Sequence, residues 1–154
     1  MTLPPMKDPG PEAVPATEEE ADEFTRARKA YDDGQWQAAI EGLDDLITSH
    51  AGGPLTVDAL YLRGLAQEAA GQPDMAAQSW IMAFGALPDG PRAPASLLAL
   101  AKLTATQGIP DQACPYLGEI ARRFPSAPEA AEAARAAQAA ACSDEPLAED
   151  AGAN

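Results

Sequence analysis

The chain is poor in aromatic side chains, basic side chains and long apolar runs, and each shortage excludes a class of protein. Only 5% of its 154 residues are aromatic. No run of about 18 apolar residues occurs, so no membrane insertion is expected. Lys and Arg number 10 against 24 Asp and Glu, which gives a formal net charge of −14. Nucleic acids and anionic membrane surfaces bind basic patches, so nucleic acid is not expected as a partner.

The sequence also lacks the patterns that usually carry chemistry. There is no glycine-rich phosphate loop, no nucleophile elbow and no catalytic acid pair. The one histidine, His50, has no serine or carboxylate arrangement around it and is interpreted as a solvated loop residue. One distant histidine and two cysteines do not make four ligands, so no metal site is expected. We therefore predict a non-enzymatic protein without a catalytic residue or a cofactor.

What the sequence does contain is a repeat of 37 residues. Three residue types share this interval, at Gly34, Gly71 and Gly108, at Ala39, Ala76 and Ala113, and at Pro54, Pro91 and Pro128. A fixed period of this size is typical of stacked helical repeats. The glycines allow a reversal with positive φ or a close approach, and the alanines let neighbouring helices approach closely. Four residues after the alanines, on the same helix face, stand the expected core residues Leu43, Trp80 and Leu117.

The repeat predicts an all-α fold of three antiparallel helix pairs followed by a capping helix. The expected helices span 17–33, 36–49, 55–70, 73–87, 94–107, 110–124 and 128–141. Thr17 and Glu20 form a capping-box pattern at the start of the first helix. The run Glu18 to Glu20 is interpreted as a favourable N-terminal charge cluster and nothing more.

The composition divides the chain into three parts. Residues 1–17 are Pro-rich, lack the apolar stretch of a secretory signal and are expected to be a disordered lead. Residues 18–142 form the predicted repeat domain, with repeats at about 20–53, 54–90 and 91–127 and the capping helix at 128–142. Residues 143–154 are expected to be a disordered acidic tail.

The helix pairs resemble tetratricopeptide repeats (TPR). Gly64 and Ala101 match the small residue of the first TPR helix, and Pro88 and Pro125 match the closing proline, which Ala51 replaces in the first repeat. This resemblance implies a right-handed α-solenoid. The interval exceeds the usual one of about 34 residues, and the excess lies in the Pro-bearing loops.

Segments 58–64, 90–100, 113–114 and 123–130 resemble the C-terminal domain of the Tol-Pal accessory protein family, also called the cell division coordinator CpoB or YbgF. The resemblance covers about residues 22–142, and the position of Cys114 is a fairly specific mark of it. It implies a periplasmic protein that binds the central region of TolA and coordinates outer-membrane constriction with septal peptidoglycan synthesis, with peptidoglycan synthase machinery as a further partner. Residues 1–20 carry neither the signal nor the trimerising heptads of that family, so this chain is expected to be a monomer, and an oligomer only if a coiled coil precedes it. The alternative is a cytoplasmic TPR scaffold or co-chaperone that binds a partner peptide.

A partner-binding groove is expected along the first helices of the pairs. Its predicted lining is Phe24, Arg28, Tyr31, Tyr61, Leu65, Glu68, Leu98 and Lys102. Tyrosine and arginine are frequent binding hot spots, so this mixed apolar and basic strip would accept a peptide or helix. The alternative is that Tyr31, Tyr61 and Leu65 pack between helices.

The two cysteines could either form a disulfide or remain as free thiols. Cys114 near the start of one helix and Cys142 near the end of its antiparallel neighbour are expected at the same level. A disulfide there would fasten the capping helix and contribute about 3 kcal/mol. Two buried thiols are the alternative. We expect the bond in an oxidising periplasm and free thiols in a cytosol.

Overall fold

The computed structural model describes residues 15–143, and this part of the chain is helical with no strand. Its elements are α1 (Glu18–Asp32), α2 (Trp36–Ser49), α3 (Thr56–Ala69), α4 (Pro73–Ala86), α5 (Ala93–Thr106), the 3₁₀ turn η1 (Pro110–Ala113), α6 (Cys114–Arg123) and α7 (Glu129–Ala139). The predicted all-α fold is confirmed. The greater part of the expected disordered lead and tail lies outside the described residues.

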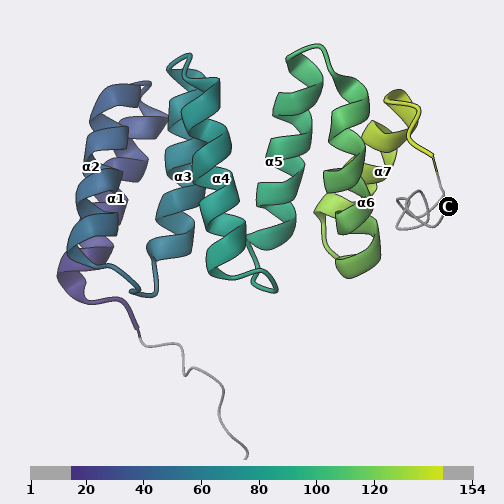
Figure 1. Cartoon of the computed structure of the whole chain (residues 1–154). Helices are drawn as coiled ribbons and strands as arrows, with labels where there is room; N and C mark the ends of the chain where they lie inside the picture. Colours follow the sequence, from purple (N-terminus) through teal and green to yellow (C-terminus); the bar gives the residue numbers. More distant parts are fainter. Residues whose placement is uncertain (1–14, 144–154) are drawn as a thin grey trace, which may run out of the picture.

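The helices stand side by side in the order of the sequence, with α1 at one end and α7 at the other (Figure 1). Each helix packs against the next one along the chain, and α1 also contacts α3 while α5 contacts α7. The short turns between α1 and α2 and between α3 and α4 lie at the upper ends of the helices in this view, and the longer proline-bearing loops lie at their lower ends. Successive helices are therefore antiparallel.

The repeated glycines make the tight turns. Gly34, Gly71 and Gly108 have φ of +77°, +78° and +86°, which confirms the predicted positive φ. At the first turn the N–H of Gly34 donates to the carbonyl of Tyr31, and the N–H of Gln35 donates to that of Ala30. This pair of bonds ends a helix by satisfying two of its last carbonyl groups. The turn after α3 repeats the same two bonds one period later.

The other repeated positions form the core. Ala39, Ala76 and Ala113 are buried with at most 1% of their surface exposed, and Leu43, Trp80 and Leu117 with at most 3%. Their predicted burial is confirmed. The indole Nε1 of Trp80 also donates to the Tyr61 carbonyl at 3.1 Å, so this side chain fastens α4 to α3 as well as filling space.

The sixth predicted helix, 110–124, is divided into η1 and α6. The cause is Pro115, which has no N–H to donate to the carbonyl of Asp111. The N–H of Cys114 donates to that carbonyl instead, in the tighter pattern of a 3₁₀ turn. A regular α-helix therefore begins only at Cys114.

One acidic residue at the start of α1 has a different role from the predicted one. The Thr17 Oγ1 accepts from the Glu20 N–H at 3.1 Å, as a capping box requires. The Glu20 carboxylate instead accepts the N–H of Leu55 at 3.0 Å, in the loop before α3, and the residue is 3% exposed. The interpretation of Glu20 as part of a simple charge cluster was wrong, because this buried carboxylate joins α1 to the second helix pair.

Replacing Glu20 with alanine is expected to lower the free energy of unfolding by about 1.5 to 3 kcal/mol, since the Leu55 N–H loses a charged acceptor. Equilibrium denaturation of wild type and variant measures the difference. Glu18→Ala is the matched control in the same turn, because Glu18 is exposed and should cost less than about 1 kcal/mol. Equal losses in the two variants would contradict the role of the Glu20 bond.

Candidate functional site

A pocket of about 470 Å³ opens between α3, α5 and α7. Helix α4 contributes one residue to it, and the four helices together supply Tyr61, Leu65, Glu68, Trp80, Ala95, Leu98, Ala99, Lys102, Thr106, Glu129 and Glu132. The lining combines an apolar floor with charged side chains. We refer to it below as the α3–α5–α7 pocket.

Five of the eight predicted groove residues lie in this pocket: Tyr61, Leu65, Glu68, Leu98 and Lys102. The three from α1 do not. Phe24 and Tyr31 are half-buried and pack on the core between α1, α2 and α3. The Tyr31 ring also lies 5.3 Å from that of Trp36. Arg28 is exposed, with its Nε 3.9 Å from an Asp32 carboxylate oxygen.

The pocket wall at Tyr61 is held by contacts with two other side chains. The backbone carbonyl of Tyr61 accepts from Trp80, and the Arg92 guanidinium lies 5.4 Å from the centre of the Tyr61 ring. Arg92 is itself fixed by a 2.8 Å bond from its Nε to the Asp58 carboxylate. Burial raises the pKa of the Tyr61 phenol, and the Arg92 charge opposes this only in part. The phenol is therefore a neutral hydrogen-bond donor at the pocket wall.

The pocket carries a net negative charge, whereas a mixed apolar and basic strip was predicted from the sequence. Three carboxylates, Glu68, Glu129 and Glu132, face one ammonium group, that of Lys102. Lys102 Nζ lies 3.0 Å from a Glu132 oxygen, so these two charges offset each other. Neither Glu68 nor Glu129 forms an ion pair within the described part of the chain. Two carboxylates therefore remain available to a ligand.

The contribution of α7 to the pocket was not predicted from the sequence. Glu129 and Glu132 on this helix are only partly exposed, and both line the pocket. One further step of 37 residues from Ala95, on α5, leads to Glu132. Applying the repeat to the capping helix would have found it, because α7 occupies the place of the first helix of a fourth pair.

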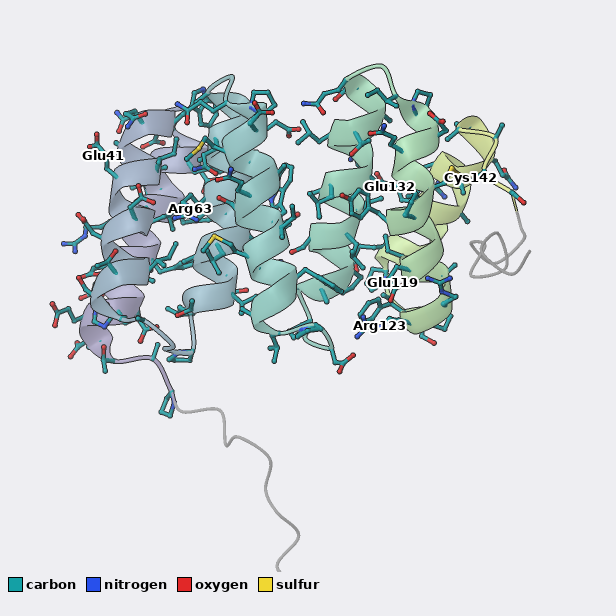
Figure 2. The ribbon with its side chains drawn as sticks, viewed as in Figure 1. Glu41, Arg63, Glu119, Arg123, Glu132 and Cys142 are labelled. Atoms are coloured by element: carbon teal, nitrogen blue, oxygen red, sulfur yellow. A yellow bond between two sulfur atoms is a disulfide. The ribbon has the colours of Figure 1, made fainter. Side chains whose placement is uncertain are left out.

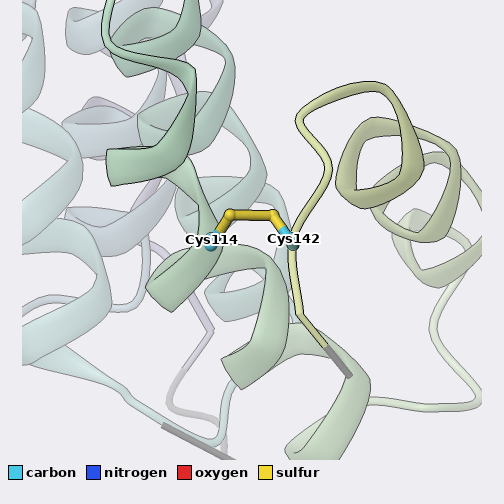
Figure 3. The surroundings of a disulfide bond; sticks show 2 residues. All are labelled: Cys114 and Cys142. Atoms are coloured by element: carbon cyan, nitrogen blue, oxygen red, sulfur yellow. A yellow bond between two sulfur atoms is a disulfide. The ribbon is translucent and has the colours of Figure 1, made fainter. Parts of the chain in front are cut away.

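The cysteines form a second feature at the same end of the row. Cys114 and Cys142 are joined in a disulfide with their Cα atoms 5.6 Å apart (Figure 3). Cys142 is brought there by the end of α7, where Ala141 has φ of +55°. The N–H of Cys142 then donates to the Ala137 carbonyl at 2.9 Å. Of the two states that the sequence left open, the structure has the disulfide, which fastens α7 to α6.

His50 is not a solvated loop residue, contrary to the sequence interpretation. Its side chain is 18% exposed, and its Nε2 lies 3.5 Å from a Glu23 carboxylate oxygen on α1. The two residues are distant in sequence, and no repeat or motif connects them. Only the packing of the loop after α2 against α1 brings them together.

Comparisons of the chain with family models and with curated proteins give no match. Within residues 15–143, no helix has the length and apolar character needed to cross a bilayer.

Proposed function

We propose that this chain is a non-enzymatic protein-binding module, a right-handed TPR-like solenoid whose α3–α5–α7 pocket receives a segment of a partner protein. The observation that carries the proposal is the composition of the pocket. Concave sites that bind ligands combine apolar walls with a few placed polar groups. Here Leu65, Leu98 and Trp80 supply apolar surface, and Tyr61 with the carboxylates supplies the polar groups.

The charges favour a partner segment that carries a basic side chain. Glu68 on α3 and Glu129 on α7 come from different helices and both line the pocket. An ammonium or guanidinium group placed between them would gain two carboxylates, whereas an acidic segment would be repelled. The apolar stem of a lysine or arginine would pack on the Leu65 and Leu98 side chains.

The disulfide supports an oxidising compartment, since such bonds persist outside the reducing cytosol. Cys114 and Cys142 are compatible with the periplasm in this respect. Together with the resemblance to the Tol-Pal accessory family, this favours a TolA-like envelope protein as the partner. On this proposal the module would link outer-membrane constriction to septal peptidoglycan synthesis during cell division.

Glu68→Lys is expected to weaken binding of the helical region of TolA at least about tenfold, because a charge in the pocket is reversed. Calorimetric titration of the purified domain measures the dissociation constant. Glu41→Lys is the matched control, since Glu41 lies on α2 at the other end of the row from Glu132 (Figure 2). It should leave the affinity within about twofold.

Two results would count against different parts of the proposal. If the wild-type domain does not bind the TolA region, the proposed partner is wrong. If Glu68→Lys and Glu41→Lys change the affinity equally, the partner binds outside the α3–α5–α7 pocket.

A further inference from the structure

Three side chains that can ligate a metal converge at the other end of the row, away from the α3–α5–α7 pocket. Glu19 and Glu23 lie four residues apart on α1 and so share one face of the helix. His50 caps the C-terminus of α2. One ligand atom from each of the three residues lies within 4.8 Å of the other two. Helix α1 and the start of the loop after α2 thus supply two carboxylates and one imidazole to one cluster.

Two of these ligand atoms are buried without a hydrogen-bond partner. The Glu23 Oε2 and the His50 Nε2 are shielded from solvent, and neither makes a hydrogen bond. Buried polar atoms of this kind are rare in folded proteins, because each loses its hydration without compensation. Either a proton shared between the two atoms or an ion bound by both would stabilise them in this position.

The distance between the two atoms is compatible with a shared ion. Nε2 and Oε2 are 3.5 Å apart, whereas an N–H···O hydrogen bond is usually about 2.9 Å long. Zinc ligands stand about 2.0 to 2.1 Å from the metal, so two ligands at a tetrahedral zinc are separated by about 3.3 Å. The observed spacing is closer to that of two ligands on one ion.

The backbone holds His50 in place. Its N–H donates to the Leu46 carbonyl at 2.9 Å, and its own carbonyl accepts from the Gly53 N–H at 2.9 Å and from the Thr56 hydroxyl at 3.3 Å. The Glu20 carboxylate binds the next part of the loop through the Leu55 N–H. The imidazole therefore approaches Glu23 from a fixed loop, and little ordering is needed when a ligand binds.

We propose that Glu19, Glu23 and His50 bind a divalent transition-metal ion, with Zn²⁺ as the ion of best fit. Two carboxylates balance the charge of the dication, and a neutral imidazole completes three protein ligands, which leaves the fourth position of a tetrahedral zinc to water. The imidazole ligand favours Zn²⁺ over Ca²⁺ and Mg²⁺, which prefer oxygen ligands. The proposal is independent of the α3–α5–α7 pocket and replaces the expectation that the chain has no metal site.

The chain suits a simple test, because few other imidazole or thiol ligands compete for the metal. His50 is its one histidine, and the described cysteines are both in the disulfide. Calorimetric titration of the untagged full chain with Zn²⁺ should show one ion bound per chain. His50→Gln and Glu23→Gln should each weaken binding at least about tenfold, since even outer-sphere changes at metal sites cost that much. The control Glu18→Gln, on the same turn of α1 but outside the cluster, should bind Zn²⁺ as the wild type does.

A second measurement separates lost binding from lost folding. Zn²⁺ should raise the melting temperature of the wild type and of Glu18→Gln, but not that of His50→Gln, while all three have the same helical circular dichroism without metal. Co²⁺ in place of Zn²⁺ should give the visible absorption of a tetrahedral site. Failure of the wild type to bind Zn²⁺, or unchanged Zn²⁺ binding by His50→Gln, would overturn the proposal and leave a His50–Glu23 ion pair.

Discussion

Gly64→Ala is expected to destabilise the domain by about 2 to 3 kcal/mol, even though alanine is the better helix former. A Cβ at this position on α3 would lie 2.2 Å from the Trp80 Nε1 and 2.6 Å from two ring carbons. The indole cannot move away easily, because it is 1% exposed and its Nε1 donates to the Tyr61 carbonyl. Urea denaturation, followed by circular dichroism, measures the loss as a lower midpoint with an unchanged slope.

Gly118→Ala on α6 is the matched control for this experiment. No atom from outside its own helix lies within 4 Å of the position where its Cβ would be. The substitution should leave stability unchanged or raise it by up to about 1 kcal/mol, the usual gain of alanine over glycine in a helix. If Gly64→Ala behaves like Gly118→Ala, α3 and α4 are not in the close contact described above.

Loss of the disulfide has the second large expected effect. The double variant Cys114→Ser, Cys142→Ser should unfold with a free energy lower by about 3.5 kcal/mol, from the loop-closure entropy for a separation of 28 residues. Without the disulfide the unfolded chain gains conformational entropy, which favours unfolding. The folded structure is not altered, so its helical circular dichroism should change little. Guanidinium denaturation of the oxidised wild type and of the double variant measures the difference.

Reduction of the wild type provides the control for the serine substitutions. The reduced protein should match the double variant in stability within about 1 kcal/mol, since both lack the same restraint. A reduced wild type as stable as the oxidised one would show that the bond between α6 and α7 does not restrain the unfolded chain.

The repeat predicted the positions that depend on backbone and size alone. A turn glycine, a small residue at a helix contact and a large apolar residue one turn later recur because each repeat solves the same packing problem. Ala76 and Trp80 on α4 could therefore be placed from their equivalents in α2. The division of the helix at Pro115 was not predicted, although a proline inside a helix removes a donor wherever it stands.

The polar contacts could not be predicted in this way, because the repeat does not contain them. One and two periods after Glu20 stand Val57 and Pro94, so nothing marks Glu20 as a buried acceptor. The approach of His50 to Glu23 depends on the path of one loop. The acidic character of the pocket came from α7, whose relation to the repeat was not used. Contacts that occur once in the chain need tertiary structure to be seen.

The arrangement of the helices in a row has a consequence for how the domain opens. The terminal helices have neighbours on one side only, and in such linear arrays local unfolding begins at the ends.

The two ends of the row are held by different interactions. At the α7 end a covalent bond responds to the redox state of the surroundings. At the α1 end the Glu20 carboxylate binds the loop before α3, and the proposed ligands beside it respond to metal ions. Amide exchange in the first helix pair would then depend on the metal ions in the solution, and exchange in α7 on its oxidising power.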